Sequence, residues 1–148
     1  MRSTITALVF GCLLVPDASA CSCAPITLQN AAKSADSVLL ATLQEARLLP
    51  GGSHDQALIE GKFLVYKTLK GSPPAGLIIL RTPRDDSSCG VKMMVAAKYV
   101  IFKKSGSDAI IACDGSAVIE HFGPVSQWEE NEVTDEVQKA APKKPRQR

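Results

Sequence analysis

The placement of the cysteines is the feature that most limits how this chain can fold. The 148-residue sequence contains five cysteines, and one of them, Cys12, lies in an apolar stretch near the start. The other four are Cys21, Cys23, Cys89 and Cys113. The first two stand one residue apart in a CSC motif, far along the chain from the others. Bridges from this motif to distant cysteines would tie the start of the domain to its later segments.

The stretch before the CSC motif has the features of a secretory signal peptide. Arg2 supplies a positive charge, residues 5–15 form an apolar run, and residues 18–20 are small, which is the pattern that signal peptidase cuts. The run is shorter than the roughly 20 apolar residues that a membrane-spanning helix needs, and no later segment is apolar enough to span a membrane. We therefore expect residues 1–20 to be removed, which gives a secreted or periplasmic protein that begins at Cys21.

A lipoprotein is the alternative reading of the same region. Cys21 would then carry a lipid and its amine would be acylated. That processing favours a bulky aliphatic residue three positions before the cysteine, where this chain has the small Ala18. The sequence therefore favours a free amine on Cys21.

Export indicates that the four remaining cysteines form disulfides. An even number of cysteines in an oxidising compartment favours two bridges, with three possible pairings. A bridge between Cys21 and Cys23 would strain so short a loop, so the motif is expected to reach two separate places. A soft copper or zinc site on this thiolate pair stays open, although it needs a reducing environment or early metal capture. A redox dithiol more usually has CXXC spacing.

The apolar pattern between the cysteines is mainly that of β-structure. One short helix is expected at residues 28–34, and a helix is a rival to the first strand because Leu, Ala and Glu are abundant there. The expected strands are residues 37–49, 57–70, 77–82, 98–103 and 109–113, the last two forming a hairpin. Short strands with turn residues between them are typical of a small closed or nearly closed barrel.

The C-terminal part has a different composition. We expect the folded domain to cover residues 21–122 and a charged extension to follow over residues 123–148. Its first half can form a helix whose apolar stripe consists of Trp128, Val133 and Val137. Residues 141–148 combine bases with prolines, a composition typical of disorder.

Several function classes are disfavoured by the residues present. A formal net charge of +2 is too balanced to suggest nucleic-acid binding. His54 and His121 are the only histidines and belong to no hydrolase motif. Asp85 and Asp86 are more typical of a solvated acidic turn than of a cation site. We therefore expect neither an enzyme nor a bound cofactor.

The CSCAP sequence at residues 21–25 resembles the CXCXP opening of the tissue inhibitors of metalloproteinases, whose N-terminal domain is a netrin-like module. Further segments resemble that family in the same order, namely residues 34–43, 63–71, 87–90 and 98–113. The resemblance implies a mainly β, five-stranded OB-fold barrel with one or two short flanking helices. It also implies two disulfides, Cys21–Cys89 and Cys23–Cys113.

Two departures from the family pattern bear on affinity and target choice. The third disulfide of the inhibitory domain and the cysteine-rich second domain have no counterpart here. The chain therefore resembles a single-domain relative of bacterial type.

The resemblance implies a secreted, monomeric inhibitor of zinc metalloendopeptidases. The amine and carbonyl of Cys21 would chelate the zinc of the protease, and Ser22 would enter its primary specificity pocket. A side contact is expected from the loop at residues 49–56. The implied contact ridge consists of Ser22, Cys23, Ala24, Pro25, Ser87 and Ser88. The alternative function is a non-inhibitory netrin-like binding module of the cell envelope, with or without a lipid anchor on Cys21.

Overall fold

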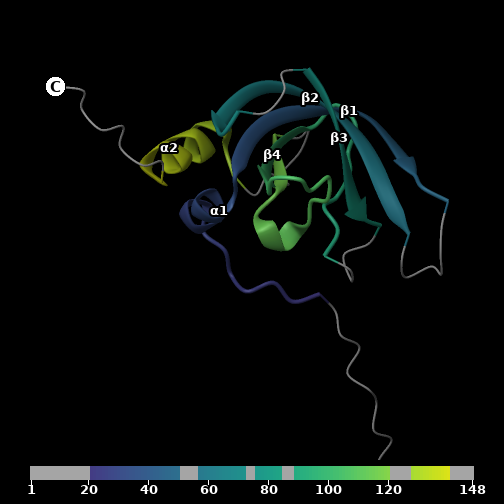
Figure 1. The fold of residues 1–148 in the computed structure, drawn as a ribbon, viewed down its shortest axis with the longest axis horizontal. Helices are drawn as coiled ribbons and strands as arrows, with labels where there is room; N and C mark the ends of the chain where they lie inside the picture. Colours follow the sequence, from purple (N-terminus) through teal and green to yellow (C-terminus); the bar gives the residue numbers. More distant parts are fainter. Residues whose placement is uncertain (1–20, 51–56, 73–75, 85–88, 121–127, 141–148) are drawn as a thin grey trace, which may run out of the picture.

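The computed structural model describes residues 21–50, 57–72, 76–84, 89–120 and 128–140. These residues form one five-stranded antiparallel sheet and two helices (Figure 1). The elements are α1 (Leu28–Ser34), β1 (Ser37–Leu48), β2 (Leu58–Lys70), β3 (Gly76–Pro83), β4 (Lys98–Lys103), the 3₁₀ turn η3 (Ala112–Asp114), β5 (Ala117–Glu120) and α2 (Glu130–Ala140). Neither helix of this described part is long and apolar enough to cross a membrane.

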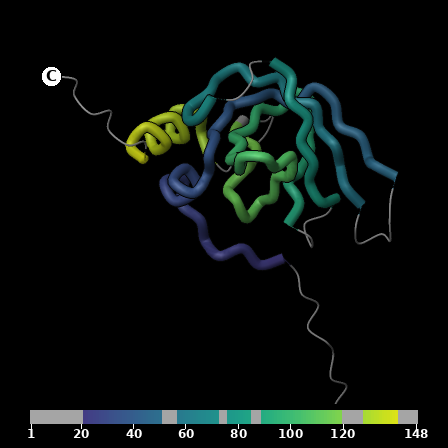
Figure 2. The backbone as a smooth tube through the Cα atoms, viewed as in Figure 1, coloured from purple at the N-terminus to yellow at the C-terminus, as the bar shows by residue number. Residues whose placement is uncertain are grey.

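The sheet is strongly curled but open. Its strand order is β3-β2-β1-β4-β5, so β3 and β5 are the two edges. The long strands β1 and β2 pair with three register shifts, and such bulges bend a sheet and increase its twist. Both strands arch over the later segments in Figure 2. The expected mainly β fold is confirmed, whereas β3 and β5 do not pair to close a barrel.

The curled sheet separates two apolar layers. Alternate residues of a strand point to opposite faces, and both faces of β1 and β4 are covered. The layer under the helices contains Val38, Leu40, Val100 and Phe102 together with Leu28, Ala31, Val133 and Val137. The layer inside the curl contains Leu39, Ala41, Leu43, Tyr99 and Ile101 together with Phe63, Leu80, Val91 and Ile110. A strand buried on both faces has a continuous apolar sequence rather than an alternating one.

Helix α2 belongs to the same core as the sheet. Its Val133 and Val137 are fully buried, and Trp128 packs partly buried against them. The expected apolar stripe on this helix is confirmed for Val133 and Val137, whereas Trp128 lies before the first residue of α2. Figure 1 shows α2 lying beside α1 at one end of the molecule.

Two lysines donate hydrogen bonds to the backbone carbonyls at the C-terminal end of α1. The Nζ of Lys70 donates to the carbonyls of Ala32 at 2.8 Å and Ala35 at 2.6 Å, and Lys104 donates to the carbonyl of Ser34. The last carbonyls of a helix have no intrahelical partner and carry partial negative charge, so cations stabilise them. At its other end, the helix begins where Thr27 accepts a hydrogen bond from the backbone of Asn30.

The predicted helix at residues 28–34 is confirmed, and the first four predicted strands match β1 to β4 within one or two residues. The helical alternative for residues 37–49 is wrong, because β1 pairs on both sides over this stretch. Several predictions lie outside the described residues: the signal peptide at 1–20, His54, Asp85, Asp86, His121 and the tail at 141–148.

The predicted strand at residues 109–113 and its hairpin are wrong. Ala109 makes one isolated parallel bridge to Arg81 of β3, and the chain then turns through η3. The strand that pairs with β4 is β5, four residues further on. Ile110 is buried in the inner core and Ile111 is exposed, which is the alternation of a strand. Here it arises because the chain crosses the edge of β3 without pairing along it.

Gly115 allows the turn that follows η3. Its φ is +96°, and a Cβ there would lie 2.9 Å from the Cβ of Ala31. We expect Gly115→Ala to lower the free energy of unfolding by about 2–4 kcal/mol, because left-handed strain and overpacking add. Gly106→Ala is the matched control, since Gly106 has a φ of +76° with nothing within 4 Å of the added Cβ. Urea denaturation should therefore give a clearly smaller loss for Gly106→Ala, and equal losses would contradict the close approach to Ala31.

Glu60 joins three strands through its carboxylate. It accepts hydrogen bonds from Arg47 of β1 at 2.9 Å and from Arg81 of β3 at 3.0 Å, and Arg81 also pairs with Asp108. Hydrogen bonds lower the pKa of Glu60 below its usual value. Those from Arg47 have the largest effect and those from Arg81 the next largest. The ion pairs therefore stabilise the fold when Glu60 is ionised.

The lowered pKa of Glu60 predicts an acid-sensitive contribution to stability. It is present above the unfolded-state pKa of 4.5 and is lost as the pH falls through the folded-state value. We expect Glu60→Gln to be less stable than the native protein at pH 7, with a difference that shrinks in acid. Glu45→Gln is the control, because Glu45 pairs with Lys62 where both side chains are about half exposed and such pairs contribute little. A pH-independent effect of Glu60→Gln in denaturation series would contradict the pairing.

Candidate functional site

The CSC segment lies against the part of the fold that carries the other two cysteines. Figure 1 shows the segment in purple, running from α1 beneath the green region around η3. Ser22, Ala24 and Pro25 are exposed, whereas Cys21 is half-buried. Ile26 packs partly buried against the core under the helices. The segment is thus held at its cysteines and again just before α1.

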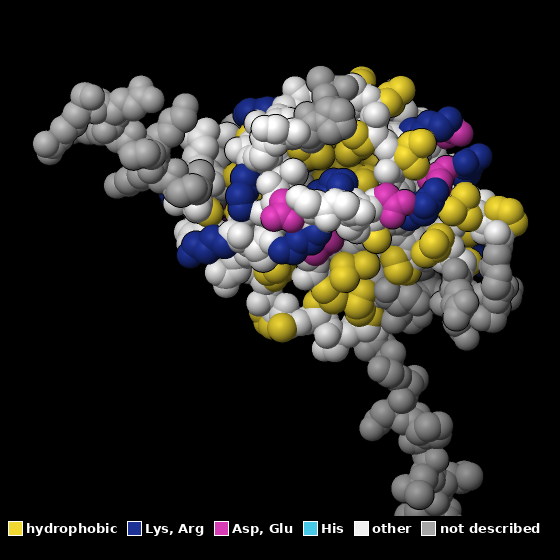
Figure 3. All heavy atoms as spheres, viewed as in Figure 1, with side chains coloured by type: hydrophobic (Ala, Val, Ile, Leu, Met, Phe, Trp, Pro, Cys, Tyr) yellow, Lys and Arg dark blue, Asp and Glu magenta, His cyan; other side chains and the backbone are white. Residues whose placement is uncertain are grey.

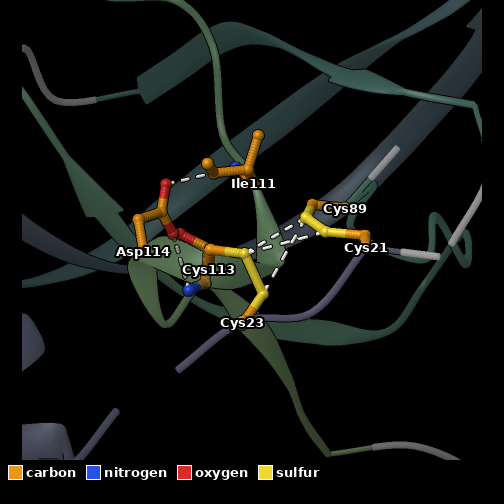
Figure 4. The surroundings of a disulfide bond; sticks show 7 residues. Cys21, Cys23, Cys89, Ile111, Cys113 and Asp114 are labelled. Atoms are coloured by element: carbon orange, nitrogen blue, oxygen red, sulfur yellow. Dashed lines mark hydrogen bonds between the residues drawn. A yellow bond between two sulfur atoms is a disulfide. The ribbon is translucent and has the colours of Figure 1, made fainter. Parts of the chain in front are cut away.

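Two disulfides join the segment to the fold. Cys21 pairs with Cys89, and Cys23 pairs with Cys113, with Cα–Cα distances of 5.3 and 5.1 Å (Figure 4). Both distances lie in the ordinary range for a disulfide. This is the pairing that the family resemblance implies, and the structure confirms it.

The four sulfur atoms also form one compact cluster. All of them lie within 4.8 Å of one another. Across the two bridges, the Sγ atoms of Cys21 and Cys113 are 3.9 Å apart, and those of Cys23 and Cys89 are also 3.9 Å apart. Because Cys21 and Cys23 are one residue apart, two bridges from this motif bring the sulfurs of Cys89 and Cys113 close together as well.

Cys89 is positioned by backbone contacts on both sides. Its φ of +58° is left-handed, and its carbonyl accepts a hydrogen bond from the amide of Ala112 at 2.9 Å. Two residues later, the amide of Val91 donates to the Oγ1 of Thr82, a buried side chain of β3, at 2.7 Å. These hydrogen bonds hold Cys89 near η3 and β3 independently of the disulfides.

Tyr99 secures the loop that follows Cys89. Its hydroxyl accepts a hydrogen bond from the amide of Met94 at 2.7 Å and donates to the carbonyl of Lys92 at 2.8 Å. The ring is buried and packs edge-on against Phe63. Burial raises the pKa of Tyr99 to about 12, so the hydroxyl keeps its proton and both contacts at ordinary pH.

Cys113 is positioned by the 3₁₀ turn and by Asp114. The Asp114 carboxylate accepts a hydrogen bond from the amide of Ile111 at 3.1 Å (Figure 4). It also accepts one from the amide of Ser116 at 2.8 Å. Burial raises the pKa of Asp114 despite these hydrogen bonds. An Asp-Gly pair directly after the cysteine is a turn signal that could have identified this turn from the sequence.

The structure thus brings together Cys21, Cys23, Cys89 and Cys113, with Ser22, Ala24 and Pro25 exposed beside them. Ser87 and Ser88 of the expected contact ridge lie outside the described residues, as do residues 51–56 of the expected side-contact loop. Among the described residues, these four cysteines are also the one group of three or more His, Cys, Asp or Glu side chains whose ligand atoms lie close enough together to hold a metal ion, were the disulfides open.

The outer face of β2 and β3 carries exposed apolar side chains. Leu64 pairs across the strands with Leu77, and Ile79 follows on the same face of β3. Their exposed fractions are 43%, 64% and 50%. On the face seen in Figure 3, hydrophobic side chains lie among lysines, arginines and acids.

No protein-family model and no curated protein sequence matches this chain. The functional argument therefore depends on the disulfide-linked N-terminal segment and on the sheet that supports it.

Proposed function

We propose that this protein is a secreted inhibitor of zinc metalloendopeptidases that acts through the amine and carbonyl of Cys21. The observation that carries the proposal is the pair of disulfides that fixes the first and third residues of the predicted mature chain. A chain terminus normally frays. Two bridges within three residues of the terminus hold it in place, which is what a terminus that itself binds a partner would need.

The chemistry of a free N-terminal residue suits a catalytic zinc. The α-amine nitrogen and the carbonyl oxygen of Cys21 can close a five-membered chelate ring on a metal ion. A catalytic zinc keeps one coordination position for water, and the chelate would displace that water. The amine pKa of about 7.7–8.0 makes the neutral lone pair accessible near neutral pH, and zinc binding favours the deprotonated form.

The anchoring of the segment supports tight binding. Because the disulfides and Ile26 order the segment in the free protein, little conformational entropy remains to be lost in a complex. The exposed Ser22 would enter the specificity pocket of the protease. Cys23, Ala24 and Pro25 would continue the contact ridge, and Ser87 and Ser88, next to Cys89 in sequence, would complete it.

The same proposal includes a netrin-like OB-fold. The curled five-stranded antiparallel sheet, the flanking helices and the cysteine pairing support this assignment. The parallel bridge between Ala109 and Arg81 brings the segment before β5 to the edge of β3, which is where strand pairing would close such a barrel.

A non-inhibitory binding module of the cell envelope is the second candidate. The exposed apolar side chains Leu64, Leu77 and Ile79 favour it, since surfaces of this kind often bind other proteins. A lipid anchor on Cys21 is disfavoured, because the lipid would occupy the sulfur that bonds to Cys89.

An inhibition panel tests the proposal. The purified protein with Cys21 at its N-terminus should inhibit at least one zinc endopeptidase and leave a serine protease of similar substrate preference unaffected. The variant Leu77→Lys should inhibit equally well. Failure to inhibit any member of a broad panel, together with loss of binding to an envelope partner in Leu77→Lys, would instead establish the binding module.

A further inference from the structure

The four sulfur atoms lie close enough together to bind one metal ion if both disulfides were open. Zinc bound by four thiolates is tetrahedral, with Zn–S distances of about 2.3 Å, which places neighbouring sulfurs about 3.8 Å apart. The sulfurs of Cys21 and Cys113, and those of Cys23 and Cys89, are each 3.9 Å apart, whereas those of Cys89 and Cys113 are closer, at 3.1 Å. None of the four sulfurs lies more than 4.8 Å from another. If both disulfides opened, the two bonded pairs and the Cys89–Cys113 pair would have to move apart for the four sulfurs to surround one ion.

Part of this arrangement does not depend on the disulfides. The hydrogen bond between the amide of Ala112 and the carbonyl of Cys89 keeps the backbone segments that carry Cys89 and Cys113 together. Hydrogen bonds to the side chains of Thr82 and Asp114 hold the backbone just after each of these cysteines. The other two thiols come from the CSC motif, where one intervening residue keeps them close. Reduction removes most of the stability that the bridges supply, so the folded reduced form depends on the metal, which stabilises it by binding it in preference to the unfolded chain. In that folded form two sulfurs are placed by the fold and two lie on one short segment.

We propose that the reduced protein binds one Zn²⁺ through the thiolates of Cys21, Cys23, Cys89 and Cys113. Two molecules of a dithiol reductant supply four electrons and four protons, open both disulfides and become disulfides themselves. The four thiols then release four protons as Zn²⁺ takes their sulfurs. Two molecules of the oxidised dithiol reverse the reaction: they accept four electrons and four protons, both protein disulfides form again, and the ion is released because a sulfur in a disulfide is no longer a thiolate ligand.

The redox state of the four cysteines would determine which kind of cross-link holds the N-terminal segment. In the oxidised protein, two disulfides hold the segment to the η3 region. In the reduced protein, the metal holds the same segment at the same place. The soft four-sulfur tetrahedral donor set favours zinc over the harder divalent cations. The inference is independent of protease inhibition, since it uses the cysteine sulfurs and not the amine of Cys21.

Cobalt substitution tests the site directly. The protein reduced with a dithiol and then freed of reductant under anaerobic conditions should bind one Co²⁺ per chain. We expect the intense ligand-field and sulfur-to-cobalt charge-transfer bands of a tetrahedral four-thiolate complex, which stoichiometric Zn²⁺ should abolish. The oxidised protein should show none of these bands. Equal bands before and after reduction, or a complex with two chains per ion, would overturn the proposal.

Thiol protection identifies the ligands even where reduction loosens the fold. With Zn²⁺ about 100-fold above its dissociation constant, alkylation of all four cysteines should slow by about 100-fold, in proportion to the free fraction. Cys113→Ser should change the cobalt bands to those of a three-thiolate complex. Ser22→Ala, in the middle of the motif, is the matched control and should bind as the native protein does. Protection of Cys21 and Cys23 alone would show an unfolded chelating motif and would overturn the four-sulfur site.

Discussion

One alanine added ahead of Cys21 is expected to abolish inhibition of a sensitive zinc endopeptidase. The extension converts the α-amine into an amide nitrogen, which has no basic lone pair, and it places a residue where the protease zinc must approach. We expect the inhibition constant to rise by at least about 1,000-fold, which corresponds to about 4 kcal/mol. The disulfides and the fold should be unaffected, because the addition lies outside both bridges.

Two matched variants separate the chelate from its surroundings. Acetylation of the Cys21 amine should act like the added alanine, because it removes the same lone pair without adding a residue. Ser22→Gly should weaken inhibition less, since it removes a side chain from the specificity pocket and leaves the chelate. If the extended protein inhibits as well as the native one while its peptide map shows both disulfides, the chelation mechanism is wrong.

Inhibition should also depend on pH in a direction set by the amine. A proton competes with zinc for the lone pair, so inhibition should weaken as the pH falls well below the amine pKa of about 7.7–8.0. The measurement is the inhibition constant across a pH series, corrected for the activity of the protease alone. A constant that does not rise in acid would contradict coordination by the amine.

Removal of one disulfide is expected to lower the free energy of unfolding substantially. The double variant Cys23→Ala, Cys113→Ala removes a bridge between residues 90 positions apart. The other bridge still ties the motif to Cys89, and Cys89 is only 24 residues from Cys113. The loop that the lost bridge closes is therefore effectively about 26 residues long, and its removal should cost about 3.5 kcal/mol.

Urea denaturation of the two single-bridge variants and of the variant without either bridge measures how each bridge changes the effect of the other. The variant without Cys21 and Cys89 should lose about as much as the variant without Cys23 and Cys113, because either remaining bridge shortens the other loop in the same way. Removal of both bridges should cost about 8 kcal/mol, which approaches the whole stability of a typical domain. A loss below about 1 kcal/mol for either single-bridge variant would show that the N-terminal segment is not held as the structure describes.

Local sequence patterns were enough to identify most elements of this fold. The helix at residues 28–34 and the strands β1 to β4 follow from short-range apolar patterns and from the turn residues between them. The two disulfides were expected from the even number of cysteines in a predicted exported chain, and their pairing from the resemblance carried by the CSCAP motif. These features depend on neighbours in the sequence or on a motif.

Tertiary structure alone decided the path of the chain beyond β4 and the geometry of the cysteine cluster. Ile110 lies in an apolar run that is typical of a strand, yet this segment only crosses the edge of β3 and then turns at Gly115. The strand that pairs with β4 is β5. The apolar stripe that contains Val133 follows from the sequence, but the partners that bury it, α1 and the sheet, do not. The four sulfurs lie within 4.8 Å of one another, at a place set by the backbone hydrogen bond between Ala112 and Cys89. Each of these outcomes depends on contacts between residues far apart in sequence, which no local pattern encodes.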